Sequence, residues 1–350
     1  MSNITGILGR EELKKHFNEA LVNGKVSHAY IFSGEPGTGK KTVAKSFAQI
    51  LLCEGVESHV EKGDAVAEKI HACGRCESCK MAMEKKHPDI IFIEKETGKK
   101  SISVEDIREK LINDVAVKPY KGPYKVYIIK EAQDLSIEAQ SAMLKTMEEP
   151  PEYAVIILLV NTDSLLLPTI RSRCETIEIP ILSDEIVNEY LKAEYGQKEG
   201  IKADDIRFAT VFSEGKIGRG MVALTNPDFK LLKHDVIRLV TGIYDMDYND
   251  MVAAVRKTKD YNDMLIDYFF ELMSIWYRDV LMFKSTRDAN DLMYKEEISE
   301  ISKQAQVISY EGLDLITKAV EKAKERLRAN VSFEVAMEML LMAIQENMNL

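Results

Sequence analysis

The sequence predicts an α/β fold with a parallel sheet, followed by segments that are helical only. Three observations lead to this prediction. Short apolar runs alternate with amphipathic helical patterns up to residue 179, and such alternation is typical of parallel strands joined by helices. A glycine-rich turn joins the first apolar run to a long helix. From Phe229 onward the apolar residues recur at helical spacing throughout.

The first segment combines an amphipathic helix near Glu11–Asn23, a strand at Ala29–Phe32 and a turn at Gly34–Lys40. The turn fits the G-x-x-x-x-G-K pattern of phosphate-binding P-loops. Its glycines allow backbone N–H groups to point at phosphate oxygens, and the helix N-terminus adds partial positive charge. The alternative is a glycine turn that binds no ligand. The predicted nucleotide-binding residues here are Gly34, Gly37, Thr38, Gly39, Lys40, Lys41 and Thr42.

The residue after Lys40 departs from the P-loop pattern. It should be Ser or Thr, whose hydroxyl holds Mg²⁺, but it is Lys41. Thr42 comes one residue later, which on a helix is a rotation of about 100°, so its hydroxyl should not reach the metal position. We therefore expect the loop to bind ATP or ADP but to lack the usual hydroxyl ligand for Mg²⁺.

A cysteine module follows at residues 53–79. Cys73, Cys76 and Cys79 are separated by two residues each, a spacing that lets thiolates converge on one tetrahedral zinc. Cys53 is the natural fourth ligand, and His59 and His71 compete for that place. Because no coordination position would stay open, we expect a structural zinc rather than a catalytic one; free surface thiols are the alternative.

Strands are predicted next at Ile90–Ile93 and Lys125–Ile129, with a helix between them that Ser103 caps and that runs to about residue 113. Asp106 stands where a capping box needs an acid. In P-loop NTPases such a strand usually ends in an Asp that binds Mg²⁺, but this one ends in Lys130, followed by Glu131. A lysine cannot coordinate a cation, so we expect hydrolysis to be lost. The alternative is that Lys130 is a solvated residue at a strand end.

The last part of the predicted sheet contains a helix capped by Ser136, which stops before Pro150, and strands at Ala154–Val160 and Glu175–Ile179. The run Ala154–Val160 is aliphatic throughout, which predicts a central strand buried on both faces. Asn161 follows it, where a polar side chain could contact a γ-phosphate. We therefore count Glu131 and Asn161 among the nucleotide-binding candidates.

Composition limits the class of protein. The chain has 350 residues, enough for two or three domains, and its 45% apolar and 30% charged content is ordinary for a globular protein. A net charge of −10 would not attract nucleic acid by itself, so any DNA contact must be local or shared with partners. No apolar run is long enough to span a bilayer, and the N-terminus lacks a signal-peptide pattern, so we expect a cytoplasmic protein.

Taken together, these features resemble the clamp-loader branch of the AAA+ proteins. The resemblance is carried by His28-Ala29-Tyr30, the P-loop, the cysteine module, Glu148-Glu149-Pro150 and the box Ser172-Arg173-Cys174, which occur in this order there. It is specific over residues 1 to about 225 and only architectural beyond. It implies an AAA+ P-loop domain at residues 1–179, a small helical lid domain at 180–226, and an all-helical collar domain for oligomerisation at 227–350.

The resemblance also implies roles and partners. Arg173 corresponds to an arginine finger that acts in trans on the nucleotide of a neighbouring subunit, and Arg219 to a second arginine that senses phosphate from the lid. Without the family, a structural ion pair of Arg173, for example with Glu175, would be the simpler interpretation. The implied partners are the tau/gamma and delta subunits in a ring of five, the sliding clamp, and primed DNA reached through the complex.

Three functions remain to be distinguished. The first is a clamp-loader subunit that activates its neighbours without hydrolysing ATP, the second is an ATP-hydrolysing tau/gamma-type motor, and the third is a zinc-stabilised interaction protein with a relic P-loop. The polymerase holoenzyme copies DNA, but the sequence shows no paired metal-binding carboxylates of the kind that nucleotidyl transfer needs. We therefore expect no polymerase chemistry in this chain. The helical residues Leu265, Ile266, Phe269, Leu272, Met273 and Trp276 are interpreted as core.

Overall fold

A five-stranded parallel sheet organises the first half of the chain. The structure, a computed structural model, describes residues 7–348 except 56–71, 97 and 100. The strands lie in the order β2-β3-β4-β1-β5 and are β1 (Ala29–Ser33), β2 (Ile90–Ile93), β3 (Lys125–Ile129), β4 (Ala154–Val160) and β5 (Glu175–Glu178). The five predicted strands are thus confirmed to within one residue at each end.

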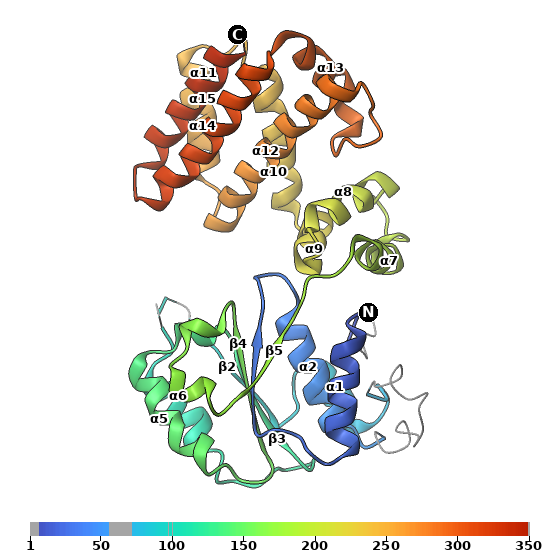
Figure 1. Ribbon diagram of the computed structural model, residues 1–350, viewed down its shortest axis with the longest axis vertical. Coiled ribbons are helices and arrows are strands. Elements are labelled where there is room, and N and C mark those ends of the chain that lie inside the picture. Colours follow the sequence, from blue (N-terminus) through green and yellow to red (C-terminus); the bar gives the residue numbers. More distant parts are fainter. Residues whose placement is uncertain (1–6, 56–71, 97, 100, 349–350) are drawn as a thin grey trace. The chain divides into compact units, whose positions relative to one another are not determined.

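Helices cover both faces of this sheet (Figure 1). On one face, α1 (Glu11–Val22) and α2 (Lys40–Leu51) bury Phe17 and Phe47 against β1, and their rings stack with centroids 4.1 Å apart. On the other face lie α4 (Val104–Ile107), η3 (Arg108–Ile112), α5 (Ile137–Glu148) and α6 (Pro168–Arg171). All seven residues of β4 are buried, as its aliphatic sequence predicts for a strand covered on both sides.

Local sequence signals set several helix ends. Ser103 and Asp106 form the predicted capping box, in which each side chain accepts from the other residue's backbone N–H. The helix that starts there is α-helical only to Ile107 and then widens into the π-helical segment η3. Ser136 caps α5 by accepting from the Ala139 N–H at 3.1 Å. The remaining elements of this region are α3 (Glu77–Met83), η4 (Ala132–Asp134), η5 (Asp163–Leu165) and α7 (Asp184–Tyr195).

The parallel register brings functional residues to one edge of the sheet. Ser33 at the end of β1 lies opposite Val160 at the end of β4, so the loop that begins at Gly34 starts beside Asn161. Ile129 at the end of β3 lies opposite Leu158, which places Lys130 and Glu131 at the same edge. Carboxyl ends of parallel strands are where ligands bind in folds of this class.

The C-terminal part is helical, as predicted. Its elements are α8 (Ala203–Ser213), α9 (Ile217–Thr225), α10 (Pro227–Gly242), α11 (Tyr248–Lys259), α12 (Asp263–Thr286), η6 (Lys295–Glu297), α13 (Ile298–Val307), α14 (Tyr310–Arg328) and α15 (Phe333–Asn347). Trp276 of α12 is fully buried and donates from Nε1 to Gln304 Oε1 at 2.9 Å, while Gln304 Nε2 donates to the Val240 carbonyl at 2.6 Å. One amide thus ties α12, α13 and α10 together. The predicted core residues of α12 are buried, except that Ile266 is only partly so.

The chain forms two compact units. The N-terminal unit runs to Gln197 and includes Ser213–Gly220; the C-terminal unit comprises Lys198–Phe212 and the chain from Met221 onward. The division into an AAA+ domain (1–179), a lid (180–226) and a collar (227–350) stays a prediction. Among the helices of the described residues, none has both the length and the apolar character needed to cross a membrane.

Candidate functional site

The predicted P-loop lies between the end of β1 and the start of α2. Gly34, Gly37 and Gly39 have φ values of 154°, 85° and 90°, a range that favours glycine. A Cβ atom on Gly34 would lie 2.7 Å from the carbonyl oxygen of Ile179, so a side chain does not fit there. No side chain caps α2 after Gly39, and the N–H groups of its first turn can therefore serve a phosphate.

Lys40 folds back over this loop. Its Nζ donates to the carbonyl oxygens of Gly34 and Glu35, the latter at 3.0 Å, and to Asn161 Oδ1 at 3.2 Å. Burial lowers the pKa of Lys40, and the carboxylates of Glu131 and Glu35 oppose that shift. The structure thus brings together the predicted residues Gly34, Lys40 and Asn161, with Glu131 close enough to act on the ammonium group.

Thr38 points inward rather than toward solvent. It is 1% exposed, and its hydroxyl donates to the Glu35 carbonyl at 2.9 Å. Arg10 holds the same turn from outside: its guanidinium donates to the Thr38 carbonyl at 2.6 Å and to the Pro180 carbonyl at 2.9 Å. Sequence reasoning missed Arg10, because its partners lie 28 and 170 residues away and no local pattern marks it.

The start of α9 also contacts the P-loop. The Gly218 N–H donates to the Gly37 carbonyl at 3.2 Å, and Lys216 pairs with Glu35 at 2.6 Å, which lowers the pKa of Glu35. Arg219 is 13% exposed and pairs with Glu214 at 3.1 Å. The predicted lid arginine therefore lies within the N-terminal unit, one residue from the backbone contact with the loop.

Neither predicted Mg²⁺ position carries an oxygen ligand. Lys41 is exposed on the first turn of α2, and Thr42 lines a cavity between α2, α3 and β2, as its rotation on the helix predicts. The Lys130 side chain is 17% exposed and forms an ion pair with Glu94. Lys130 is thus partly buried and ion-paired at the strand end, and its role at the metal position stays a prediction. Glu131 adopts a left-handed φ of 47° directly after it.

Arg173 lies outside the P-loop. Its guanidinium pairs with Glu148 at the end of α5 at 2.6 Å and donates to the Thr169 carbonyl at 2.9 Å. The ion pair within the chain that was the simpler interpretation of Arg173 is therefore present, but its partner is Glu148. Glu175 accepts from Ser27 Oγ at 2.6 Å and contacts His16 instead. The side chain of Arg173 is 35% exposed, so a charged group of another molecule can reach it.

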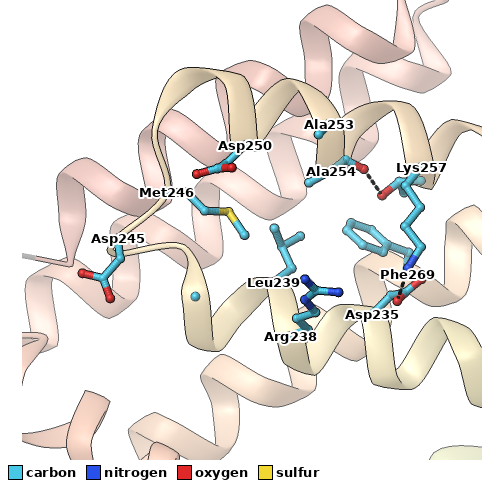
Figure 2. Close-up of a pocket in the computed structure, with 12 residues that line it drawn as sticks. Asp235, Arg238, Leu239, Asp245, Met246, Asp250, Ala253, Ala254, Lys257 and Phe269 are labelled. Carbon is cyan, nitrogen blue, oxygen red and sulfur yellow. Dashed lines mark hydrogen bonds and ion pairs between the residues drawn. The ribbon is translucent and has the colours of Figure 1, made fainter.

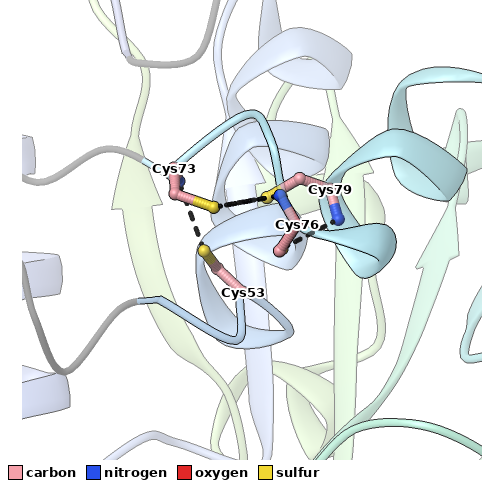
Figure 3. Close-up of side chains that lie close together, drawn as sticks. All are labelled: Cys53, Cys73, Cys76 and Cys79. Carbon is pink, nitrogen blue, oxygen red and sulfur yellow. Dashed lines mark hydrogen bonds between the residues drawn. The ribbon is translucent and has the colours of Figure 1, made fainter.

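The four predicted cysteines converge (Figure 3). Cys53 follows α2, and Cys73, Cys76 and Cys79 approach it from the turn before α3 and from α3 itself. Their Sγ atoms all lie within 4.8 Å of one another, and those of Cys73 and Cys79 are 3.9 Å apart. Tetrahedral zinc with Zn–S distances of about 2.3 Å needs sulfurs about 3.8 Å apart. The donor set and spacing fit a structural zinc; His59 and His71 lie outside the described residues.

Backbone N–H groups support thiolates in this cluster. The N–H of Cys73 points at Cys53 Sγ at 3.2 Å, that of Cys76 at Cys73 Sγ at 3.4 Å, and that of Cys79 at Cys76 Sγ at 3.3 Å. Such bonds, led by the one from Arg75, lower the pKa of Cys73 to about 6. Burial raises the pKa of Cys53 and Cys79. One thiolate is therefore available at neutral pH, and a metal ion would displace the remaining protons.

A cavity of about 480 Å³ lies in the C-terminal unit between α10, α11 and α12 (Figure 2). Asp235 and Lys257 pair on its wall at 2.5 Å, and Tyr261 donates to Asp235 at 2.8 Å. The cavity contains none of the predicted site residues, and two of its charged groups, Asp235 and Lys257, are partners of one another. Its size alone does not make it a functional site.

Comparison with known proteins places the chain. The family described as "DNA polymerase III, delta subunit" matches residues 9–183, half of the sequence, including the P-loop, the cysteine module and Arg173. The chain belongs to this family. Its fold is the P-loop α/β fold with helical C-terminal part that the sequence predicts.

The proteins similar to this chain include two kinds of DNA polymerase III subunit. The chain is 30% identical to DNA polymerase III subunit tau of Bacillus subtilis over 94% of this chain and 60% of that protein, so it spans three fifths of the length of that relative. It is 24% identical to DNA polymerase III subunit delta' of Pseudomonas aeruginosa over 90% of each. A gamma subunit-related protein of Thermotoga maritima has a solved structure that aligns over 97% of this chain and all of that one, with 17% identity and a TM-score of 0.46.

Proposed function

We propose that this chain is the delta prime type of clamp-loader subunit in DNA polymerase III, an AAA+ protein that binds partners without hydrolysing ATP efficiently. The observation that carries the proposal is the replacement of both Mg²⁺ ligands by lysines, Lys41 and Lys130, beside an otherwise intact P-loop. Binding Mg²⁺ at the place of these ammonium groups would bring like charges together, which costs electrostatic free energy. Family membership and the relative named delta' support the same assignment.

In this role Arg173 acts in trans. It lies on the surface, held by one exposed carboxylate, Glu148, and a γ-phosphate on a neighbouring subunit offers more negative charge than that partner. Arginine fingers accelerate hydrolysis by about 10³- to 10⁵-fold. The subunit thus supplies a catalytic residue to a tau/gamma neighbour, and it joins tau/gamma and delta in a ring of five that loads the sliding clamp on primed DNA. The helical C-terminal region provides the collar of that ring.

The zinc site and the P-loop have supporting roles in this proposal. Zinc at Cys53, Cys73, Cys76 and Cys79 fixes α3 against the end of α2. ATP or ADP binds through the glycine loop, Lys40 and Asn161, with Arg219 as the phosphate sensor of the lid. Glu131 remains in place to orient a water molecule, but without a metal ion it has little to act on.

The alternative function is an ATP-hydrolysing motor subunit of tau/gamma type. It is favoured by the intact glycine cradle and by 30% identity to a tau subunit over nearly the whole chain. The two functions differ in a simple property, the ATP turnover of the isolated chain.

The deciding experiment measures nucleotide binding and turnover by the purified chain with and without Mg²⁺. The proposal expects no turnover, or turnover unchanged by Lys40→Ala. A rate that depends on Mg²⁺ and is abolished by Lys40→Ala would establish the motor instead.

A second measurement tests the role in trans. In a complex reconstituted with tau/gamma and delta, Arg173→Ala should lower the DNA-stimulated ATPase rate by orders of magnitude. Arg171→Ala is the matched control, because Arg171 lies two residues away and pairs within this chain with Asp163 at 3.7 Å. Equal activity of the two variants would refute the trans role.

A further inference from the structure

A small cavity beside α2 is walled by cationic groups that nucleotide binding does not use. It has a volume of about 150 Å³ and lies between the middle of α2, the end of α3 and β2. Lys45 and Ser46 contribute to it from α2, Lys85 and His87 from the segment after α3, and Phe92 from β2. Two of the lining groups are therefore ammonium groups from separate elements, within reach of hydroxyl and imidazole groups.

Two further lysines adjoin this wall. The Nζ atoms of Lys45 and Lys130 lie 5.4 Å and 5.5 Å from the centroid of the Phe92 ring, so the two cations share one aromatic ring. Lys41 and Lys85 lie near enough to act on both, because together with burial, the leading cause, their charges lower the pKa of Lys130 to about 8 and also lower that of Lys45. We call the cavity with Lys41, Lys45, Lys85 and Lys130 the lysine cavity.

The charge in the lysine cavity is not balanced by the protein. Across residues 7–348 with their gaps, the ion pairs found for these four ammonium groups amount to one, between Lys130 and Glu94. Like charges held together and partly removed from water raise the free energy of the folded chain. An anion that enters the cavity would relieve the repulsion, and its attraction to the ammonium groups would offset the cost of their partial desolvation.

Size narrows the class of anion. At about 30 Å³ for each water molecule, the cavity holds roughly five waters, whereas pockets for drug-sized ligands usually start at about 300 Å³. It is too small for a whole nucleotide but has room for one phosphate group. Lysine binds phosphate as a point charge, and the Ser46 hydroxyl and Thr42 hydroxyl on the same wall are suited to phosphate oxygens.

We propose that the lysine cavity binds a phosphate-type oxyanion, on the side of α2 that Lys40 does not face. This placement follows from the partners of Lys40, whose ammonium group is directed to Gly34, Glu35 and Asn161, while the cavity opens on the opposite side of the helix start, at Thr42, Lys45 and Ser46. The oxyanion is either free phosphate or a phosphodiester of DNA, which share the chemistry that the cavity recognises.

The test uses the full-length zinc-loaded chain and measures binding of inorganic phosphate and of a short single-stranded DNA at fixed ionic strength. The variants are Lys45→Gln and Lys85→Asn, singly and together. Asn suits position 85 because Lys85 has a φ of 59°, a conformation that Asn tolerates well. Lys192→Gln with Lys303→Gln is the control, since it removes the same charge from exposed positions.

We expect the double variant Lys45→Gln/Lys85→Asn to weaken binding of at least one probe tenfold or more, and the control pair to change it less than twofold. Loss with phosphate alone identifies free phosphate as the ligand, and loss with DNA identifies the phosphodiester. The proposal is overturned if neither probe binds the unaltered chain or if the double variant matches the control. Retained zinc and an unchanged circular dichroism spectrum verify that the variants fold. If the double variant does not fold, the two single variants give the measurement instead.

Discussion

At the scale of single residues, cations occupy positions where this kind of site normally has anions or hydroxyls. By the P-loop pattern, Lys41 stands where a hydroxyl is expected and Lys130 where an acid is expected; the structure shows Lys130 paired with Glu94. Arg173 is a cation on the surface, where it forms an ion pair with Glu148. Such pairs form easily and exchange easily, since exposed ion pairs contribute only about 0–1 kcal/mol.

The Arg173–Glu148 pair gives a first prediction. Both side chains are at least one third exposed, so Glu148→Gln should lower the free energy of unfolding by less than about 1 kcal/mol. If Arg173 acts in trans as proposed, Glu148→Gln should change the ATPase rate of the reconstituted complex at most a few-fold, because a phosphate would then take the place of Glu148 as the partner of Arg173. Denaturant unfolding and steady-state ATPase assays measure the two effects. If Glu148→Gln were as damaging as Arg173→Ala, the carboxylate would be a positioning group instead.

Lys130 gives a pH-dependent prediction. Its pKa of about 8 lies below the usual lysine value, chiefly through burial, and a bound anion would raise that pKa again. Binding is then coupled to proton uptake as the pH rises above about 8, so affinity is greatest below pH 8 and falls above it, by up to tenfold for each pH unit. The charged groups that face Lys130 are Lys41, Lys45, Lys85 and Glu94.

Sulfate is the probe for this measurement, because it does not titrate in this range. Its affinity should be compared at pH 7, 8 and 9 at constant ionic strength, with Lys130→Met as the control that removes the dependence. A sulfate affinity that stayed constant from pH 7 to 9 would contradict the assignment of Lys130 to the anion site.

At the scale of elements, the cysteine module holds α3 against α2. Cys53 at the end of α2 meets Cys76 and Cys79 at the start of α3. Beside it, Ser78 donates to the Leu52 carbonyl at 2.6 Å and accepts from His87 Nε2 at 2.9 Å. The same helix therefore connects the cysteine cluster to a wall of the lysine cavity.

Zinc content gives the third prediction. The purified chain should contain one zinc ion, measured by elemental analysis, and Cys53→Ser should lower this content sharply because the site loses one of four thiolates. Cys174→Ser is the matched control, since Cys174 lies outside the cluster and burial raises the pKa of its thiol to about 12. Full zinc occupancy in Cys53→Ser would mean that another residue completes the site.

The elements also show how far sequence reasoning reached. The strands were predictable because each apolar run, such as Ala154–Val160, must be buried wherever it lies. The π-helical turn at Arg108–Ile112 was not, because apolar spacing does not separate it from an ordinary helix. The cysteines were predictable from spacing alone. Arg10 and the Glu148 partner of Arg173 were not, because both contacts join distant parts of the chain.

At the scale of the whole molecule, the chain consists of two compact units with different chemistry. The N-terminal unit contains the sheet, the P-loop, the cysteine cluster and Arg173, whereas the described part of the C-terminal unit contains no such cluster. Units with separate cores can unfold separately. Metal and nucleotide should therefore act on the stability of one unit only.

Calorimetry tests this prediction. Heating should give two transitions, and a chelator should lower the midpoint of one by about 10 °C, which corresponds to roughly 3–5 kcal/mol for a unit of this size, while the other stays within about 2 °C. Trp276, the single tryptophan, is buried in the C-terminal unit, so its fluorescence should report the zinc-independent transition. A single transition that shifts as a whole would show that the two units unfold together.

The position of Lys40 has a consequence for how the loop fills. Its ammonium group donates hydrogen bonds to two carbonyl oxygens of the loop itself and to Asn161 Oδ1. A nucleotide would have to replace these oxygens by its phosphate oxygens as partners of the Lys40 ammonium group. The measured affinity for nucleotide would then equal the intrinsic affinity reduced by the fraction of chains in which Lys40 is released.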